Sequence, residues 1–273
     1  MSAYARPTRL EDALKLRAQG GFSVLAGGTD HFPARVGARR EERLLDLTAL
    51  AELRGIREAR DHWRLGATTT WTEVIGARLP PLFDCLKLAA REVGGVQIQN
   101  AGTIAGNLCH ASPAADGVPA LLALDARVEL AAAAGRRTLP LEDFIPGPRR
   151  TALREDEIVA AVLVPKPRHP ARSHFLKLGA RRYLVISIAM AAAVIERDQD
   201  RVAAARVAVG ACSPVARRLP GLEAALVGQV PDPKLVRPEH LAPLAPIDDV
   251  RGSAEYRGEA ALMLLRRLLE ALA

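Results

Sequence analysis

Apolar positions near the N-terminus follow two different periods. Between residues 8 and 18 they recur at helical spacing, directly after the capping-box sequence Thr8-Arg9-Leu10-Glu11, and this combination predicts an α-helix. The short apolar runs FSVLA (22–26) and RLLDLT (43–48) predict strands, with a helical stretch between them. The pattern therefore predicts a small α/β unit over residues 1–58.

The middle of the chain contains strand patterns that alternate with helical ones. Strands are predicted at WRLGA (63–67), RVELAAA (127–133), RRTLP (136–140) and EIVAAVLVP (157–165), and helices at about 71–78, 81–93 and 114–124. Because helices and strands are interspersed here, residues 59–166 are expected to form a second, larger α/β lobe.

A proline-rich segment marks the clearest boundary in the sequence. PKPRHPARS (165–173) contains three prolines, which favour a linker over a regular element. Three apolar segments with strand character follow: FLKLGARR (175–182), LVISIAMAAAVIER (184–197) and RVAAARVAVGAC (201–212). A leucine stripe at helical spacing near the C-terminus predicts a final helix; it consists of Leu262, Leu264, Leu265, Leu268 and Leu269. Residues 167–273 are therefore expected to form a sheet-plus-helices domain, which makes the chain an α+β protein.

The composition is that of a soluble protein with a substantial core. The 273 residues are 49% hydrophobic and 25% charged, which are ordinary values for globular domains. The net charge of +7 could favour nucleic acid, but Arg is scattered among Asp and Glu, and no basic run is interleaved with aromatic residues. We therefore expect no nucleic-acid partner. A positive surface suits an anionic cofactor or an acidic partner subunit better.

Cysteine usage argues against a metal centre or a disulfide framework in this chain. Cys85, Cys109 and Cys212 stand far apart, and no C-x-x-C motif occurs. The N-terminal sequence has no apolar signal core, and the most apolar run (183–195) is too short and too β-branched to span a membrane. A cytoplasmic protein without a membrane span is expected.

Two glycine-containing loops are the strongest candidates for a ligand site. The Rossmann fingerprint G-x-G-x-x-G and the P-loop pattern are both absent from the sequence. The first loop, Ala26-Gly27-Gly28-Thr29-Asp30, follows an apolar strand, and consecutive glycines allow the backbone to present N–H groups to an anion. The same residues would also serve a plain strand–turn–helix connection.

The second loop extends from Asn100 to Asp116 and is dominated by small residues. Its polar side chains, Thr103, Asn107, Ser112 and Asp116, are spaced to line one concave surface. Pro113 is expected to begin the following helix, with Ser112 as its N-cap. The alternative is a capped helix preceded by a glycine-rich turn, without a ligand.

Cys109 and His110 are the most reactive neighbours in this stretch, but they are not expected to act as a catalytic pair. In an extended segment, adjacent side chains point to opposite faces, whereas a nucleophile and its base must converge. A third and fourth zinc ligand are missing at suitable spacing. The sequence thus predicts no catalytic residue and no metal ligand, and it gives His110 no role.

The combination of these segments resembles one family. VLAGGTD (24–30), GGVQIQNAGTIAGNLCHASPAADGVPALLALDA (94–126), LEDFIPGPRRTALREDEIVAAVLVP (141–165) and FLKLGARRYLVISIAMAAA (175–193) resemble the FAD-binding middle subunit of molybdenum hydroxylases, the group of xanthine dehydrogenase and aerobic carbon monoxide dehydrogenase. The resemblance covers nearly the whole chain. It implies a flavin fold of the p-cresol methylhydroxylase type (PCMH-type) with two α/β lobes, followed by a C-terminal domain with a three-stranded antiparallel sheet and helices.

The resemblance also implies a set of residues that contact a non-covalent FAD. They are Leu25, Ala26, Gly27, Gly28, Thr29 and Asp30 from the first loop, Thr103, Gly106, Asn107, Cys109 and Asp116 from the second, and Val159, Lys177 and Tyr183 beyond them. Asp116 is expected on the ribityl or ribose hydroxyls, and Tyr183 is expected to stack on the flavin ring.

Two residues depart from the family pattern. Ala105 stands where a glycine is usual, and its methyl group is tolerable if φ is negative. His31 replaces a residue that is usually apolar, so it is expected either to face phosphate or to cover the outer side of the first loop.

The family further implies a role in electron transfer. Electrons would come from a large molybdopterin subunit through the 2Fe-2S clusters of a small iron–sulfur subunit, reach this chain's FAD, and leave to NAD+, a quinone or oxygen. These partners would assemble with the chain as a dimer of heterotrimers. Two alternatives stay open at this point: a stand-alone flavin-dependent oxidase or reductase of the same fold, and a basic binding module without flavin.

Overall fold

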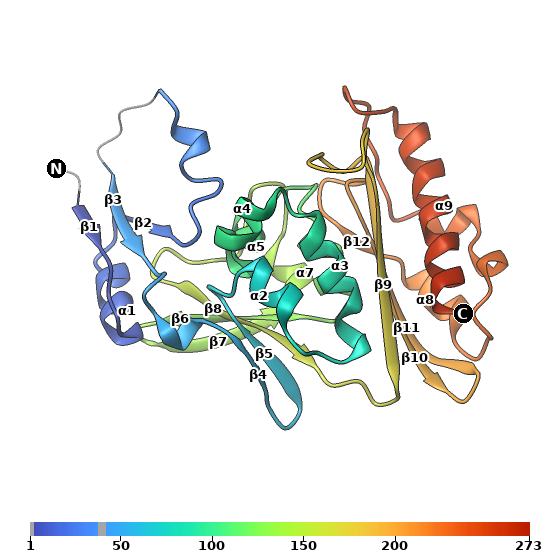
Figure 1. Ribbon diagram of the computed structural model, residues 1–273, viewed down its shortest axis with the longest axis horizontal. Coiled ribbons are helices and arrows are strands. Elements are labelled where there is room, and N and C mark those ends of the chain that lie inside the picture. Colours follow the sequence, from blue (N-terminus) through green and yellow to red (C-terminus); the bar gives the residue numbers. More distant parts are fainter. Residues whose placement is uncertain (1–2, 38–41) are drawn as a thin grey trace.

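The computed structural model describes residues 3–37 and 42–273. Three sheets follow one another along the chain, and Figure 1 shows them side by side, from the N-terminal unit on the left to the C-terminal unit on the right. This arrangement confirms the predicted α+β architecture, in which two lobes of helices and strands precede a C-terminal sheet with helices.

The first unit is a small parallel sheet covered by one helix. Its strands are β1 (Ala3–Ala5), β2 (Phe22–Leu25) and β3 (Arg43–Asp46), in the order β1-β3-β2, and its helix is α1 (Leu10–Ala18). The predicted capping box is wrong, because the N-cap is Arg9 without a side-chain bond, and Glu52 Oε1 accepts the N–H of Leu10 at 2.9 Å instead.

The helical stretch predicted between β2 and β3 is only partly present in the described residues. It consists of the short 3-10 helix η1 (Pro33–Arg35), while the part of the prediction over 38–41 lies outside the described residues. Proline at its first position is compatible with such a start, since the missing N–H has no partner there anyway.

The second unit is built on a five-stranded antiparallel sheet. In spatial order across the sheet, its strands are β4 (Ile56–Glu58), β5 (His62–Gly66), β8 (Ile158–Pro165), β6 (Arg127–Ala132) and β7 (Gly135–Pro140). The helix η2 (Ala51–Leu53) precedes β4. Short helices fill the segments between the strands: α2 (Trp71–Gly76), η3 (Pro81–Phe83), α3 (Asp84–Glu92), α4 (Val96–Ala101), α5 (Ile104–His110), α6 (Gly117–Ala123) and α7 (Leu141–Phe144). The predicted strands and helices of this region are therefore confirmed, with shifted ends.

The start of α6 corrects one predicted cap. The helix begins at Gly117 after Asp116, so Ser112 and Pro113 lie outside it. Ser112 Oγ instead accepts the N–H of Ala114 at 3.3 Å, which is a local turn of the kind that serine favours.

The third unit contains an antiparallel sheet in the order β12-β11-β10-β9. Its strands are β9 (Ala171–Leu178), β10 (Ala189–Asp198), β11 (Arg201–Gly210) and the two-residue β12 (Arg217–Arg218), and its helices are α8 (Pro220–Leu226), η4 (Pro233–Leu235), η5 (Pro238–Leu241) and α9 (Ala254–Leu272). The three long predicted strands are confirmed, and β12 adds a short fourth strand at one edge.

The strand β10 is buried on both faces, which explains its continuous apolar sequence. Met190, Ala192 and Val194 belong to the core shared with the second unit. The alternating residues Ala189, Ala191, Ala193 and Ile195 belong to the core under α9. Figure 1 shows α3 and α9 on opposite sides of this sheet. Small side chains on a strand therefore allow helices to pack closely against both of its faces.

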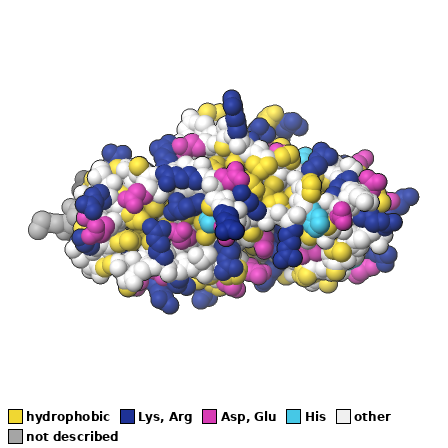
Figure 2. Space-filling model, turned by 90° about the horizontal axis from the view of Figure 1, so that it is seen from below, with side chains coloured by type: hydrophobic (Ala, Val, Ile, Leu, Met, Phe, Trp, Pro, Cys, Tyr) yellow, Lys and Arg dark blue, Asp and Glu magenta, His cyan; other side chains and the backbone are white. Residues whose placement is uncertain are grey.

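Charged residues are mixed on the molecular surface. On the face seen in Figure 2, Lys and Arg side chains are interspersed with Asp and Glu, and hydrophobic side chains gather between them. Within residues 3–37 and 42–273, no helix has the length and apolarity needed to cross a membrane.

Candidate functional site

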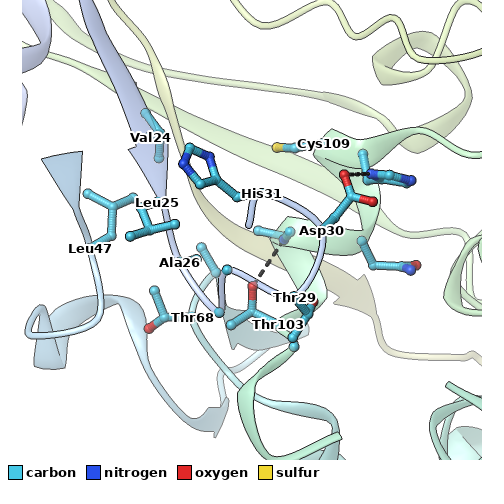
Figure 3. A pocket seen from close by; sticks show the side chains of 18 of the residues that line it. Val24, Leu25, Ala26, Thr29, Asp30, His31, Leu47, Thr68, Thr103 and Cys109 are labelled. Atoms are coloured by element: carbon cyan, nitrogen blue, oxygen red, sulfur yellow. Dashed lines mark hydrogen bonds and ion pairs between the residues drawn. The ribbon is translucent and has the colours of Figure 1, made fainter. Parts of the chain in front are cut away.

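The two predicted loops meet across a cavity of about 680 Å³. The first loop continues from the end of β2, and the segment 100–116, predicted as the second loop, contains the end of α4, a short turn and all of α5. Figure 3 shows residues of both segments around the cavity. Eleven of the fourteen sequence-predicted residues line this cavity: Leu25, Ala26, Gly27, Gly28, Thr29, Asp30, Thr103, Gly106, Asn107, Cys109 and Val159. The size is in the range of pockets that bind cofactors and other small molecules.

Gly27 packs directly against the backbone of the second loop. A Cβ atom at this position would lie 1.9 Å from the carbonyl oxygen of Ala101 and 3.0 Å from Cα of Gly102. Gly28 has φ +67, and a Cβ atom there would lie 2.6 Å from the ring of Phe32. The first glycine is thus required by contact and the second by both backbone conformation and contact.

Hydrogen bonds hold the start of α5, within the second loop, in place. The N–H groups of Ile104 and Ala105 donate to the carbonyl oxygens of Thr69 and Ala67, at 3.0 and 3.2 Å. Thr103 is the N-cap of α5, and its Oγ1 accepts the N–H of Gly106 at 3.1 Å, as Figure 3 shows. The threonine O–H remains able to donate to a ligand.

The unusual Ala105 is accommodated without strain. It lies inside α5 and is absent from the residues with positive φ. Its side chain is buried and lines the cavity. The condition set by the sequence, a negative φ, is therefore met, and the methyl group narrows the cavity rather than distorting the loop.

Asn107 carries a polar atom that calls for a partner. Its Oδ1 is buried and accepts no hydrogen bond from the described residues, although such atoms are nearly always paired in native proteins. Asn107 lines the cavity between the two loops. Oδ1 itself lies next to Gly117, outside the cavity lining, so it is the close glycine contacts of the two loops that fit a phosphate-bearing group held at this place.

An apolar wall completes the cavity, and it includes residues that the sequence reasoning missed. Val24, Leu47, Leu153 and Ile158 line it together with the predicted Val159. The pairing of β8 with β6 shifts next to Val159, and such irregularities redirect side chains in a sheet. The wall suits an aromatic ring system. No local signal separates these residues from ordinary core positions.

The mouth of the cavity contains several charged side chains. Nδ1 of His110 lies 2.5 Å from Oδ2 of Asp30, and the dashed line from Asp30 in Figure 3 marks this contact. Nε2 of His31 lies 3.4 Å from Oε2 of Glu42, which also pairs with Arg35 at 2.7 Å. His31 therefore lines the cavity while its ring faces a carboxylate.

Cys109 and His110 do not have the extended backbone that the sequence predicted. Both lie in the helix α5, so the reason given against their pairing is wrong. The ring of His110 contacts Asp30 and Arg149 instead, and Cys109 lines the cavity.

Asp116 and Lys177 form a separate buried cluster outside the lining of the cavity. Nζ of Lys177 lies 2.9 Å from Oδ2 of Asp116, and Oγ of Ser187 donates to Oδ1 at 2.8 Å. Burial raises the pKa of Asp116 above its ordinary value, and the ammonium of Lys177 acts in the opposite direction. Ser112 also lies outside the cavity lining, so the four polar residues of the second loop do not share one surface.

Tyr183 is the third predicted residue that lies apart from the cavity lining. It belongs to the segment between β9 and β10, is 65% exposed, and has the guanidinium of Arg182 over its ring at 5.4 Å. The FAD contacts expected for Asp116, Lys177 and Tyr183 stay predictions.

A parallel three-stranded lobe, an antiparallel lobe and a cavity between two glycine loops define a class of flavin-binding domain. Two family models match the chain: residues 1–167 match the FAD binding domain in molybdopterin dehydrogenase, and residues 174–272 match the CO dehydrogenase flavoprotein C-terminal domain. This chain belongs to that family, the FAD-binding subunits of molybdenum-dependent oxidoreductases.

Relatives of similar length support the assignment. The carbon monoxide dehydrogenase medium chain of Hydrogenophaga pseudoflava is 31% identical, over 98% of this chain and 96% of its own. The nicotine 6-hydroxylase medium subunit of Paenarthrobacter nicotinovorans is 30% identical, over 97% and 95%. A solved structure of carbon monoxide dehydrogenase from Hydrogenophaga pseudoflava superposes with a TM-score of 0.89 at 30% identity, covering 99% of this chain and 96% of that one.

Proposed function

We propose that this chain holds FAD non-covalently in the cavity between the two glycine loops and serves as the electron-transfer subunit of a molybdenum hydroxylase. The chemistry that FAD supplies when bound is electron transfer between the iron–sulfur clusters of a partner subunit and a terminal acceptor, which is NAD+, a quinone or oxygen. The contribution of this chain is the position and the surroundings of the cofactor.

The observation that carries this proposal is the close backbone contact of the two loops around one cavity. Gly27 lies against Ala101, so backbone groups of both loops are exposed to the same space. Because glycine has no side chain, a phosphate-bearing ligand can approach the backbone N–H groups of such loops closely. The apolar wall at Val159 offers a surface for a ring.

The partners are proposed from the relatives. Several of them are named medium chain or FAD-binding subunit, and such names describe one part of a larger complex. We infer a large molybdopterin subunit and a small iron–sulfur subunit, assembled with this chain as a dimer of heterotrimers in the cytoplasm. The molybdopterin and the 2Fe-2S clusters would belong to those partners.

The first test is the flavin content of the purified full chain. We expect a yellow protein with flavin absorbance, from which acid precipitation releases FAD into the supernatant. In the complete complex, the enzyme's substrate should bleach the flavin absorbance, whereas the isolated chain should show no bleaching. A colourless chain that binds no added FAD would contradict the proposal, and flavin that stays with the acid precipitate would contradict non-covalent binding.

A further inference from the structure

Three charged or polar side chains from three separate segments meet at the mouth of the cavity. Asp30 belongs to the first loop, His110 is the last residue of α5, and Arg149 lies in the turn between α7 and β8. Nδ1 of His110 contacts Oδ2 of Asp30 at 2.5 Å, and Nε2 contacts the guanidinium of Arg149. The ring thus connects the first glycine loop with the C-terminal end of α5, within the second loop.

The chemistry of the partners fixes the roles of the two ring nitrogens. A guanidinium has only donors, so Nε2 of His110 accepts a hydrogen bond from Arg149. Nδ1 then carries the proton and donates to the carboxylate of Asp30. The other charged groups at this end of the cavity, Arg35, Glu42 and His31, contact one another rather than His110.

We propose that His110 is a positioning residue for the cofactor site. Its Nδ1–H holds the Asp30 carboxylate, and thereby keeps the first loop against α5 with its backbone groups facing the cavity. Without this bond the carboxylate, which is 62% exposed, would be free to turn toward an anionic ligand. The inference rests on the proposed binding of FAD, whose diphosphate is the anion concerned.

Arg149 supports the ring from its outer side. Its backbone has φ +56, a conformation that is uncommon for residues other than glycine, and its N–H donates to the carbonyl oxygen of Ala111 at 2.8 Å. The turn is therefore tied to the end of α5. In this arrangement the hydrogen bond from His110 to Asp30 positions the loop, whereas the hydrogen bond from Arg149 to His110 only fixes the orientation of the imidazole ring.

Two substitutions of His110 separate its two contacts. An asparagine amide nitrogen lies near the position of Nδ1, so His110→Asn keeps the donor toward Asp30. A glutamine amide lies near the position of Nε2, so His110→Gln keeps only the contact with Arg149. Titration of the flavin-free full chain with FAD, followed by flavin fluorescence, measures the affinity of each variant.

We expect His110→Asn to bind FAD within about threefold of the wild type, and His110→Gln and His110→Ala to bind about tenfold more weakly, which is the weight of one hydrogen bond to a charged group. In an Asp30→Asn background, His110→Ala should weaken binding by less than about twofold, since the two residues act as a unit. The melting temperatures of the flavin-free variants serve as the check on folding.

The pair Asp61–His62 provides a matched control. It has an Nδ1–Oδ1 distance of 2.7 Å, and it lies at the start of β5, away from the cavity lining. His62→Gln should leave FAD affinity unchanged. If the Asn and Gln variants of His110 bind FAD equally well, the positioning role is wrong while the proposed function stands. A wild-type chain that binds no FAD would overturn both.

Discussion

Two carboxylates join distant segments of this molecule, and they do so in opposite environments. Asp116 and Lys177 are 2.9 Å apart with side chains 11% and 5% exposed, and they link the start of α6 to β9. Asp30 and His110 are 2.5 Å apart with side chains 62% and 22% exposed, and they link the first loop to α5. The geometry is similar, but the solvent around each pair differs.

The difference in solvent exposure predicts different roles for the two pairs, one in the stability of the fold and the other in the geometry of the ligand site. A buried charge that loses its partner is left uncompensated in a medium of low polarity, so breaking the pair is costly. An exposed pair is screened by water and contributes little to folding. The buried pair should therefore matter for the stability of the chain, and the pair at the cavity mouth for the affinity of its ligand.

The largest effect is expected when the buried pair is broken. Lys177→Met should lower the free energy of unfolding at pH 7 by about 3 to 5 kcal/mol, because Asp116 is left buried beside an apolar side chain. Chemical denaturation of the flavin-free chain measures this change in the free energy of unfolding. The loss should shrink on acidification, since a protonated Asp116 needs no counter-charge.

The exposed pair Lys166–Glu58 is the control for this change. Its distance is 2.6 Å, and its side chains are 31% and 61% exposed. Lys166→Met should cost less than about 1 kcal/mol. Equal losses for Lys177→Met and Lys166→Met would show that burial is not what distinguishes the two regions.

The first loop should depend on backbone fit more than on charge. Gly27→Ala places a methyl group on the carbonyl oxygen of Ala101 and should cost about 1 to 3 kcal/mol of stability through overpacking. It should also weaken FAD binding, because the two loops are pushed apart. Gly76→Ala, at the end of α2 where a Cβ atom would meet no neighbour within 4 Å, should leave FAD binding unchanged and should not lower stability, since alanine favours the helix more than glycine does.

A third carboxylate, next to the cavity, makes the free energy of unfolding depend on pH. Glu157 accepts two hydrogen bonds from Arg137, at 2.6 and 2.8 Å, and one from the N–H of Arg154. Arg137 is the main reason why the pKa of Glu157 lies below its ordinary value of 4.5, while burial acts in the opposite direction. The stabilisation is therefore present above that value and is lost as pH falls through the lower pKa of the folded state.

Replacing this carboxylate should reduce the acid sensitivity of folding. Glu157→Gln should cost about 1 kcal/mol at pH 7, and the difference from wild type should shrink as the pH falls below 4.5 and the carboxylate is protonated. Denaturation curves recorded over this acidic range and at neutral pH provide the comparison, with the exposed neighbour changed in Glu155→Gln as control. A difference that stays constant over this range would rule out the linkage.

The smallest effect on folding is expected at the cavity mouth. Asp30→Asn should change the free energy of unfolding of the flavin-free chain by less than about 0.5 kcal/mol, since the pair is exposed. A loss comparable to that of Lys177→Met would remove the contrast between the two regions. Thermal unfolding without FAD suffices for this measurement.

Much of the fold could be predicted because local patterns agree with tertiary packing. The three long strands of the C-terminal sheet and the two glycine loops follow from hydrophobic runs and turn residues. Local capping signals were less reliable. At α1 the carboxylate of Glu52, which is distant in the sequence, accepts the hydrogen bond from the N–H of Leu10. The sequence around Thr8 contains no pattern that indicates this alternative acceptor.

The candidate site could be predicted only in part. Gly27 was identifiable because consecutive glycines after an apolar strand are typical of a tight turn, and Thr103 because it lies in the segment that carries the family resemblance. The role inferred for His110 depends on Asp30, a partner far away along the chain, so the sequence around the histidine carries no signal. The same holds for Asp116, whose contacts come from Lys177 and Ser187 across the molecule.

The central claim is that the two glycine loops together hold the cofactor. Hydrogen–deuterium exchange of the full chain, recorded with and without FAD, tests it most directly. The account predicts slower exchange of backbone amides in residues 22–31 and 102–110 when FAD is present, and unchanged exchange in α8. Protection of only one loop, or of segments outside the cavity alone, would contradict it.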